Sequence, residues 1–128
     1  MKLLLDSHAF LWLALDDPKL TQKARELLTS SESNLFLSSA TIWELAIKES
    51  SGKLKLGAPL ERLVEDGVME FGISYLPVTP RHAHYVSHLP RHHADPFDRM
   101  LIAQCHVEAM RLVSGDSKLE AYGVPIVW

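Results

Sequence analysis

Several features that mark common classes of protein are missing from the sequence. It contains one cysteine, Cys105, so an internal disulfide and a cysteine-based zinc knuckle are both excluded. Cys105 stands among apolar residues of an expected helix, and we predict an inert core thiol. The apolar runs are too short to cross a bilayer, and Asp6 interrupts the signal-like start after Leu3, Leu4 and Leu5. We therefore expect a cytoplasmic protein without a membrane segment.

The chain also lacks a net positive charge, an internal repeat and a linker. Its 128 residues carry a formal net charge of −3, which argues against a protein that holds nucleic acid by charge alone. This charge does not argue against an enzyme that meets phosphate through a bound metal ion, because the ion supplies the positive field locally. With 47% hydrophobic and 23% charged residues, the composition is that of one globular domain, residues 1–128.

Short apolar runs alternate with helical patterns along the chain. Strands are expected at 2–5, 34–37, 73–78, 112–114 and 124–127. Helices are expected from about 7 to 17, and at 20–29, 40–50, 59–69, 79–89, 97–110 and 117–121. Strands separated by helices imply right-handed crossovers and a parallel sheet that is covered on both faces. The predicted fold class is α/β, a single domain with a five-stranded parallel sheet flanked by helices.

Four carboxylates stand where such a fold would gather them. Asp6 follows the first expected strand and Asp116 follows the fourth, and residues just past parallel strands line the functional crevice of an open sheet. Glu44 and Asp98 lie in early turns of two expected helices. Because like charges repel one another, a fold that gathers four acids needs a cation there. Hard oxygen ligands, with no plausible cysteine or histidine set, favour Mg²⁺ or Mn²⁺ over zinc.

Each acid also has a purely structural interpretation. The N-cap position of an expected helix suits Asp6 and Asp116, and also a further aspartate, Asp95. Glu44 either completes a capping box or pairs with Lys48, although Ser38 and Ser39 are better caps for that helix. Asp98 suits a first helical turn, where the helix dipole favours an acid. Taken singly, each acid favours the structural interpretation; taken together, their convergence on one sheet edge favours a metal site.

Seven histidines form the other group of titratable side chains, and five of them fall between residues 82 and 93. His84 and His88 are spaced to share one helix face, and His92 and His93 follow. The H-E-x-x-H pattern of zinc enzymes is absent. We interpret these histidines as solvated or RNA-facing.

Four segments resemble the motifs of one known family. They are LLLDSHAFLW at 3–12, SATIWELAIK at 39–48, DPFDRMLIAQ at 95–104 and VSGD at 113–116. Together they resemble the PIN domain, and in particular the VapC-type toxins of bacterial toxin–antitoxin pairs. The resemblance extends over the whole chain, and the order and spacing of all four segments make it specific. It implies a PIN-like, Rossmann-like fold and an endoribonuclease that depends on Mg²⁺ or Mn²⁺.

The resemblance also implies roles for particular residues and partners. The family's catalytic and metal-binding acids match Asp6, Glu44, Asp98 and Asp116. Supporting groups around these ligands are expected at Ser7, Ser114 and Asp95. Candidate contacts to RNA phosphates are Arg81, Arg91, Arg99, Lys48 and Lys53. The implied partners are an RNA substrate, a small antitoxin that fills the groove and a second copy in a homodimer, with candidate contacts around Trp12, Trp43 and residues 54–56.

The implied reaction is metal-assisted hydrolysis of RNA. Asp6, Asp98 and Asp116 hold one ion, and Glu44 with Asp116 holds a second ion or orients the attacking water. The products then carry 5′-phosphate and 3′-hydroxyl ends. An aspartyl-phosphate phosphotransferase or receiver is one alternative, but the haloacid-dehalogenase pattern needs an aspartate where His8 stands. A receiver usually pairs its acids directly after the first strand, whereas here Lys2 precedes an apolar run. The other alternative is a catalytically silent PIN-like module that binds RNA or a partner, and the presence of all four acids counts against it.

Overall fold

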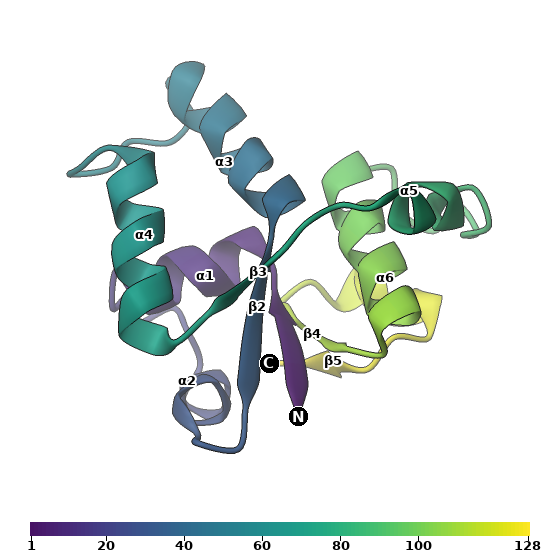
Figure 1. Cartoon of the computed structure of the whole chain (residues 1–128), viewed down its shortest axis with the longest axis horizontal. Helices are drawn as coiled ribbons and strands as arrows, with labels where there is room; N and C mark the ends of the chain where they lie inside the picture. Colours follow the sequence, from purple (N-terminus) through teal and green to yellow (C-terminus); the bar gives the residue numbers. More distant parts are fainter.

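Parallel strands and helices alternate along the chain in the computed structural model, which describes residues 1–128 (Figure 1). The strands are β1 (Lys2–Leu5), β2 (Asn34–Ser38), β3 (Ser74–Leu76), β4 (Arg111–Val113) and β5 (Ile126–Val127). The helices are α1 (Ser7–Ala14), α2 (Gln22–Thr29), α3 (Ser39–Ser50), α4 (Leu60–Phe71), α5 (Pro80–Val86), α6 (Pro96–Glu108) and the 3₁₀ helix η1 (Ser117–Tyr122). Every predicted element is present, although β3 and β5 are shorter than predicted. None of the helices is long and apolar enough to cross a membrane.

The order of the strands determines where a ligand site can form. The sheet has the order β3-β2-β1-β4-β5 and all neighbours pair in parallel, which confirms the predicted fold class. The chain moves outward from β1 to β3 and then returns to the other side of β1 for β4 and β5. The segments after β1 and β4 therefore diverge, and open sheets bind ligands at such a switch point. The backbone N–H of Asp6 donates to the carbonyl of Val113 at 3.1 Å, so the two strand ends meet there.

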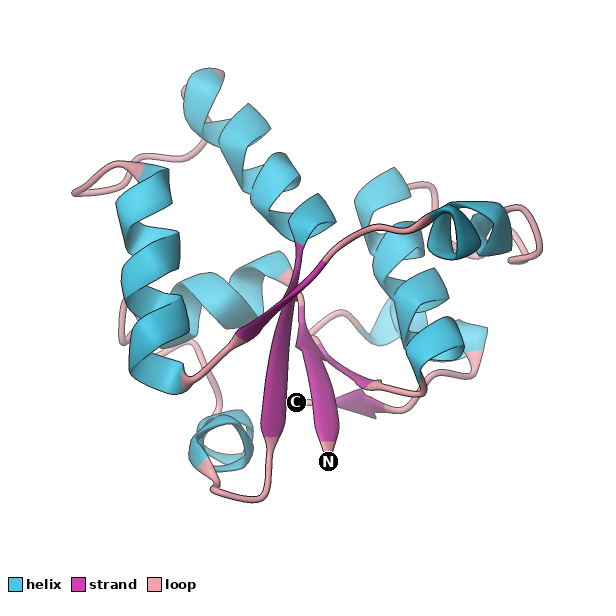
Figure 2. Cartoon of the chain, in the orientation of Figure 1, coloured by secondary structure: helices cyan, strands magenta, loops and turns pink.

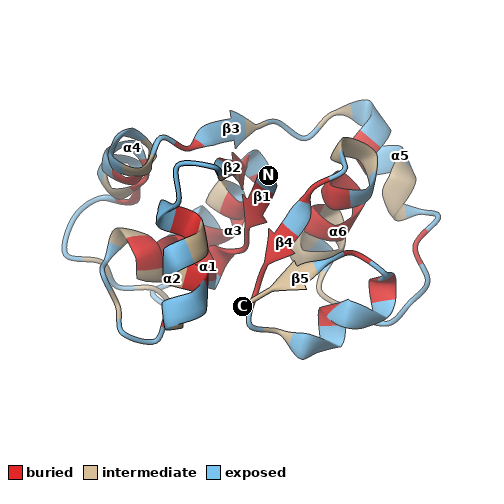
Figure 3. Ribbon diagram, turned by 90° about the horizontal axis from the view of Figure 1, so that it is seen from below, coloured by how far each residue is buried: buried red, intermediate tan, exposed pale blue.

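Alternate residues of β1 pack on opposite faces of the sheet, and helices cover both faces (Figure 2). Leu3 and Leu5 belong to a core shared with α1, α2 and α4, whereas Leu4 belongs to a core shared with α6 and η1. All three leucines are fully buried, which explains why β1 is a continuous apolar run (Figure 3). Cys105 lies in the second core, where burial raises the pKa of its thiol to about 12, as expected of an inert core thiol.

Helix caps hold three of the acids in place. Asp6 Oδ1 accepts the N–H three residues later at 2.8 Å and caps α1, and Asp95 Oδ1 caps α6 in the same way. Asp116 Oδ1 caps η1 at 3.0 Å. Ser38 caps α3, so Glu44 lies one turn deeper than a capping box would place it. The capping role of these three aspartates is thus confirmed. It does not compete with a metal site, because each cap uses Oδ1 alone and an ionised carboxylate offers about four acceptor positions.

Candidate functional site

The four predicted acids line a single pocket at the carboxyl ends of β1 and β4. The pocket has a volume of about 440 Å³, and Asp6, Glu44, Asp98 and Asp116 reach it from four separate segments of the chain. Two of the predicted supporting residues, Ser7 and Asp95, line it as well. We call this cavity the acidic pocket. Residues more than a hundred positions apart in the sequence meet here because the strand order brings β1 beside β4.

Burial makes negative charge costly in the acidic pocket. Asp6 and Glu44 are only 7% and 8% exposed. Burial raises the pKa of Asp6, and the N–H of Ala9 and the hydroxyl of Ser114 oppose this only in part. Burial, followed by the negative charges of Asp95 and Glu44, raises the pKa of Asp98 to about 7. A bound cation would relieve both effects, since it favours the ionised carboxylates.

Ser114 links the acids of the two strand ends. Its side chain is almost fully buried, its oxygen accepts the N–H of Asp116 at 3.1 Å, and its hydroxyl lowers the pKa of Asp6 through a hydrogen bond. One residue after β4 therefore positions a carboxylate on each side of the switch point. The supporting role that the sequence predicts for Ser114 requires contacts of this kind.

Lysine side chains balance part of the negative charge. Lys48 Nζ lies 3.2 Å from Glu44 Oε2, one helical turn along α3, and Lys19 lines the same pocket. The predicted ion pair of Glu44 and Lys48 is thus present, at the edge of the pocket rather than on a fully solvated face. Because five carboxylates face only two lysines, the pocket remains acidic.

His93 is a site residue that the sequence analysis missed. Its Nε2 lies 3.2 Å from Asp116 Oδ2 and 3.6 Å from Asp98 Oδ2, and the three side chains form a candidate metal-ligand group. The expectation that the clustered histidines are solvated or RNA-facing is therefore wrong for His93. It is also wrong for His82, which is fully buried with its Nε2 2.7 Å from Glu108 Oε2. A usable signal was the position of His93 two residues before the N-cap Asp95, where the chain turns back over the start of α6.

The hydrogen bonds of His93 identify its role. Its Nδ1 accepts the backbone N–H of Asp95 at 3.0 Å, so in the neutral ring the proton must lie on Nε2. Nε2–H then donates to Asp116, and neither ring nitrogen is free to bind a metal. The atoms that remain for a cation are carboxylate oxygens, which hard cations such as Mg²⁺ and Mn²⁺ prefer as ligands.

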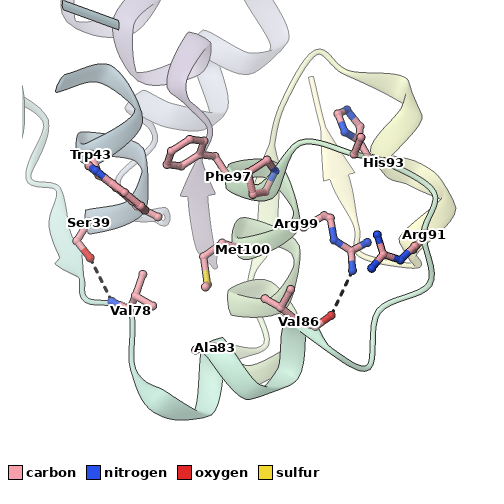
Figure 4. A pocket seen from close by; sticks show the side chains of 13 residues that line it. Ser39, Trp43, Val78, Ala83, Val86, Arg91, His93, Phe97, Arg99 and Met100 are labelled. Carbon is pink, nitrogen blue, oxygen red and sulfur yellow. Dashed lines mark hydrogen bonds between the residues drawn. The ribbon is translucent and has the colours of Figure 1, made fainter. Parts of the chain in front are cut away.

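The Arg99 guanidinium forms hydrogen bonds within the protein. It donates to the carbonyl oxygen of Val86 at 3.3 Å (Figure 4). It also donates to the carbonyl oxygen of Pro90 at 2.8 Å and to the hydroxyl of Tyr122 at 3.1 Å. These bonds fasten the segment after α5 to the first turns of α6. The predicted phosphate contact at Arg99 is therefore corrected to a structural role. Arg81, Arg91 and Lys53 are exposed, as a phosphate contact requires.

A second, mostly apolar pocket adjoins the acidic one. It has a volume of about 790 Å³ and lies between α3, α5 and α6, and His93 lines it as well as facing the acids (Figure 4). Trp43 stands at its edge with its ring 5.2 Å from that of Phe97, and remains 63% exposed. We call this cavity the apolar pocket. A large exposed indole beside an apolar cavity is typical of a protein-binding surface.

The fold and the site together define a class. The protein is a single α/β domain that gathers buried carboxylates at the switch point of a parallel sheet, in a form suited to a hard divalent cation. The sequence model of the family described as "PIN domain" matches residues 3–125, and the chain belongs to this family. The resemblance inferred from the four sequence segments is thereby confirmed.

Solved structures with the same fold come from several organisms. The chain is similar to a chain of VapBC2 from Rickettsia felis bound to a promoter DNA fragment, with a TM-score of 0.75, 14% identity and coverage of 99% of this chain and 98% of that one. For DNA-bound VapBC from Salmonella typhimurium the TM-score is 0.69 and the identity 20%, with coverage of 99% of this chain and 97% of that one. For FitAcB from Neisseria gonorrhoeae the TM-score is 0.67 and the identity 16%, with coverage of 98% of this chain and 96% of that one. At these identities the similarity concerns the fold. No curated protein sequence matches the chain significantly.

Proposed function

We propose that the protein is a metal-dependent endoribonuclease and acts in the cytoplasm as the toxin of a toxin–antitoxin pair. The observation that carries this proposal is the convergence of Asp6, Glu44, Asp98 and Asp116 on one pocket, with the pKa raised at Asp6 and Asp98. Structural groups gain nothing from such crowding, whereas ligands of a divalent cation require it. Membership of the PIN family and the fold shared with VapBC chains support the same function.

The carboxylates of Asp6, Asp98 and Asp116 would hold Mg²⁺ or Mn²⁺, directly or through water. A divalent ion bound there supplies a Lewis acid for the phosphate and a bound water of lowered pKa. Glu44, which is paired with Lys48, would orient the attacking water or, together with Asp116, hold a second ion. A nucleophile that comes from water leaves the RNA 2′-hydroxyl unused, so the products should carry 5′-phosphate and 3′-hydroxyl ends.

His93 and Ser114 act as positioning residues. His93 donates to Asp116 and Ser114 accepts from the backbone of Asp116, so this carboxylate is held from two directions. Ser7 and Asp95, which line the same pocket, complete the surroundings of the ligands. RNA phosphates would approach over Lys48 and the exposed Arg81 and Arg91, since these cations lie outside the buried acids.

Two protein partners belong to this proposal. A small antitoxin is supported by the VapBC complexes that share the fold. A homodimer is supported by the apolar pocket, because Trp43 protrudes beside a cavity on the same face. A two-fold axis through that face would seat the Trp43 of each copy in the apolar pocket of the other, as a self-complementary interface requires.

A nuclease assay tests the proposed activity. The purified protein should cleave a structured RNA in Mg²⁺ or Mn²⁺ and stop when EDTA is added. Asp98→Asn should abolish cleavage, whereas Asp66→Asn, a matched change of an exposed acid on α4, should not. Undiminished cleavage in EDTA, or products with 2′,3′-cyclic phosphate ends, would contradict the metal mechanism. RNA binding without cleavage under all of these conditions would favour the catalytically silent module.

A further inference from the structure

The acidic pocket has an aromatic wall that the proposed chemistry leaves unused. Trp12 and Trp128 are the two hydrophobic residues that line this otherwise polar pocket, and His8 lies beside them. The rings of His8 and Trp12 are stacked with centroids 5.2 Å apart and planes inclined by 21°. The rings of Trp12 and Trp128 also contact each other, with centroids 5.7 Å apart and planes inclined by 54°. We call these three residues the aromatic wall.

The backbone fixes the aromatic wall next to the acids. His8 stands two residues after Asp6, and Trp12 lies one turn further along the same face of α1. Trp128 packs against the backbone of Gly115, the residue before Asp116, so closely that a Cβ at Gly115 would lie 2.9 Å from the indole. The wall is therefore tied to both strand ends that carry the metal-binding acids.

Packing alone does not account for this arrangement. Trp12 and Trp128 are partly buried against the core on the α1 side, which a structural role explains. His8, however, is exposed, and it extends the stack into a pocket of charged side chains. Two cations share the pocket, since Lys19 Nζ lies 5.9 Å from the Trp12 ring and Lys48 stands at the edge. Aromatic rings together with cations are what a single nucleic-acid strand requires, because the bases stack and the phosphates pair.

We propose that the aromatic wall binds a nucleobase of the RNA next to the phosphate that the acids receive. This inference rests on the proposed ribonuclease function and adds to it the residues that would receive a base. A base inside a duplex already stacks on its neighbours, so only an unpaired nucleotide can lie against the wall. Every base has a π-face, and stacking is therefore tolerant of base identity.

Binding to two matched RNAs tests the inference. The probes are a short fluorescein-labelled oligoadenylate and its abasic counterpart, which has the same ribose–phosphate backbone without bases, and fluorescence anisotropy gives both affinities. Ca²⁺ is present throughout, since it offers carboxylate oxygens the same hard charge as Mg²⁺. The wild-type chain should bind the oligoadenylate tighter than the abasic strand by about tenfold or more.

Variants assign this preference to the wall. His8→Ala removes an exposed ring, and Trp128→Ala removes a partly buried one. Each should lose most of the preference for bases while the affinity for the abasic strand stays within about twofold, and Trp128→Phe should keep most of the preference. Tyr75→Ala is the control, because it removes an exposed aromatic ring on β3, outside the pocket. Melting curves identify any variant that has lost its fold, and His8→Ala remains decisive if Trp128→Ala does so.

Equal affinity of the wild type for the two strands would overturn the inference, as would an unchanged preference in both His8→Ala and Trp128→Ala. Equal competition by a duplex RNA would also overturn it, because a duplex offers no free base. Loss of antitoxin binding with RNA affinity unchanged would assign the wall to the protein partner instead. The nuclease assay is independent of these results, so base-dependent binding without cleavage would reject the proposed activity and leave the wall as an RNA-binding site.

Discussion

His93 Nε2 lies 3.2 Å from Asp116 Oδ2 and joins the loop before α6 to the loop after β4. The residue is anchored at two further points, because its ring Nδ1 accepts the N–H of Asp95 and its backbone N–H donates to the hydroxyl of Tyr122 at 2.8 Å. His93 is thus a fixed hydrogen-bond donor to a carboxylate of the acidic pocket. This donor holds part of the site in place when no cation is bound, and it leads to a first prediction.

His93→Ala should weaken Mn²⁺ binding about 10- to 100-fold, the usual effect of removing a group that orients a metal ligand. His93→Gln keeps an N–H donor and should lose much less. Calorimetric titration of the two variants with Mn²⁺ measures the difference. Equal large losses in both variants would mean that His93 is itself a metal ligand, against the proton assignment made above.

Asp98→Asn should stabilise the metal-free protein at neutral and alkaline pH. The pKa of Asp98 is about 7 in the fold against 3.8 as the reference value, so the folded state loses stability as pH rises between these two values. The shift sets an upper bound of about 4 kcal/mol. Screening in the partly open pocket should leave on the order of 1–2 kcal/mol, or roughly 3–8 °C in Tm. The difference should vanish below about pH 3, where Asp98 is protonated in both the folded and the unfolded state.

Melting curves in EDTA at several pH values measure this effect. The control is Asp66→Asn, whose side chain is exposed and pairs only with Arg62 on α4, and it should change Tm by little at any pH. An Asp98→Asn variant that is equal to or less stable than the wild type above about pH 7 would show that Asp98 only serves the start of α6.

Mn²⁺ should raise the Tm of the wild type, because an ion that binds only the folded state stabilises it by mass action. At a concentration of about one hundred times Kd, the gain is roughly 2.7 kcal/mol. Asp98→Asn should lose most of this gain, since it removes a proposed ligand, and Asp66→Asn should keep it. An unchanged Mn²⁺ shift in Asp98→Asn would remove Asp98 from the metal site.

Expression of the wild-type chain alone should slow bacterial growth, because a free toxin ribonuclease degrades cellular RNA. Asp6→Asn and Asp98→Asn should be tolerated at equal soluble protein levels, which immunoblotting of the soluble fraction checks. Growth that is equally slow with the variants would separate toxicity from the acidic pocket. Unimpaired growth with the wild type would contradict the toxin role.

Trp43→Ala should convert a dimer into a monomer without lowering Tm by more than a few degrees, because Trp43 is 63% exposed within one chain. Sedimentation at micromolar concentration measures the mass. Ile47→Ala is a weaker test of the same face, one turn further along α3. A monomeric wild type, or a Trp43→Ala variant that remains fully dimeric, would contradict an interface at the apolar pocket.

Much of the fold follows from local sequence. The run Leu3 to Leu5 is apolar at every position because both faces of a central parallel strand are buried, and that pattern is readable without coordinates. Asp6, Ser38 and Asp95 cap the helices that the sequence predicts after them, since capping depends on residues only two or three positions apart. Strand ends are less readable, and β3 and β5 are shorter than their apolar runs because pairing with a neighbour decides where a strand stops.

Local patterning and the topology of parallel sheets suffice to predict the fold class, the order of the elements and the four acids of the pocket. Polar contacts between segments that are distant in the sequence could be identified only in the folded chain. In the folded chain His93 contacts Asp116, Arg99 donates to the carbonyl of Pro90, and Trp128 packs on Gly115. These contacts join segments distant in the sequence, and their geometry depends on close packing that no local pattern encodes.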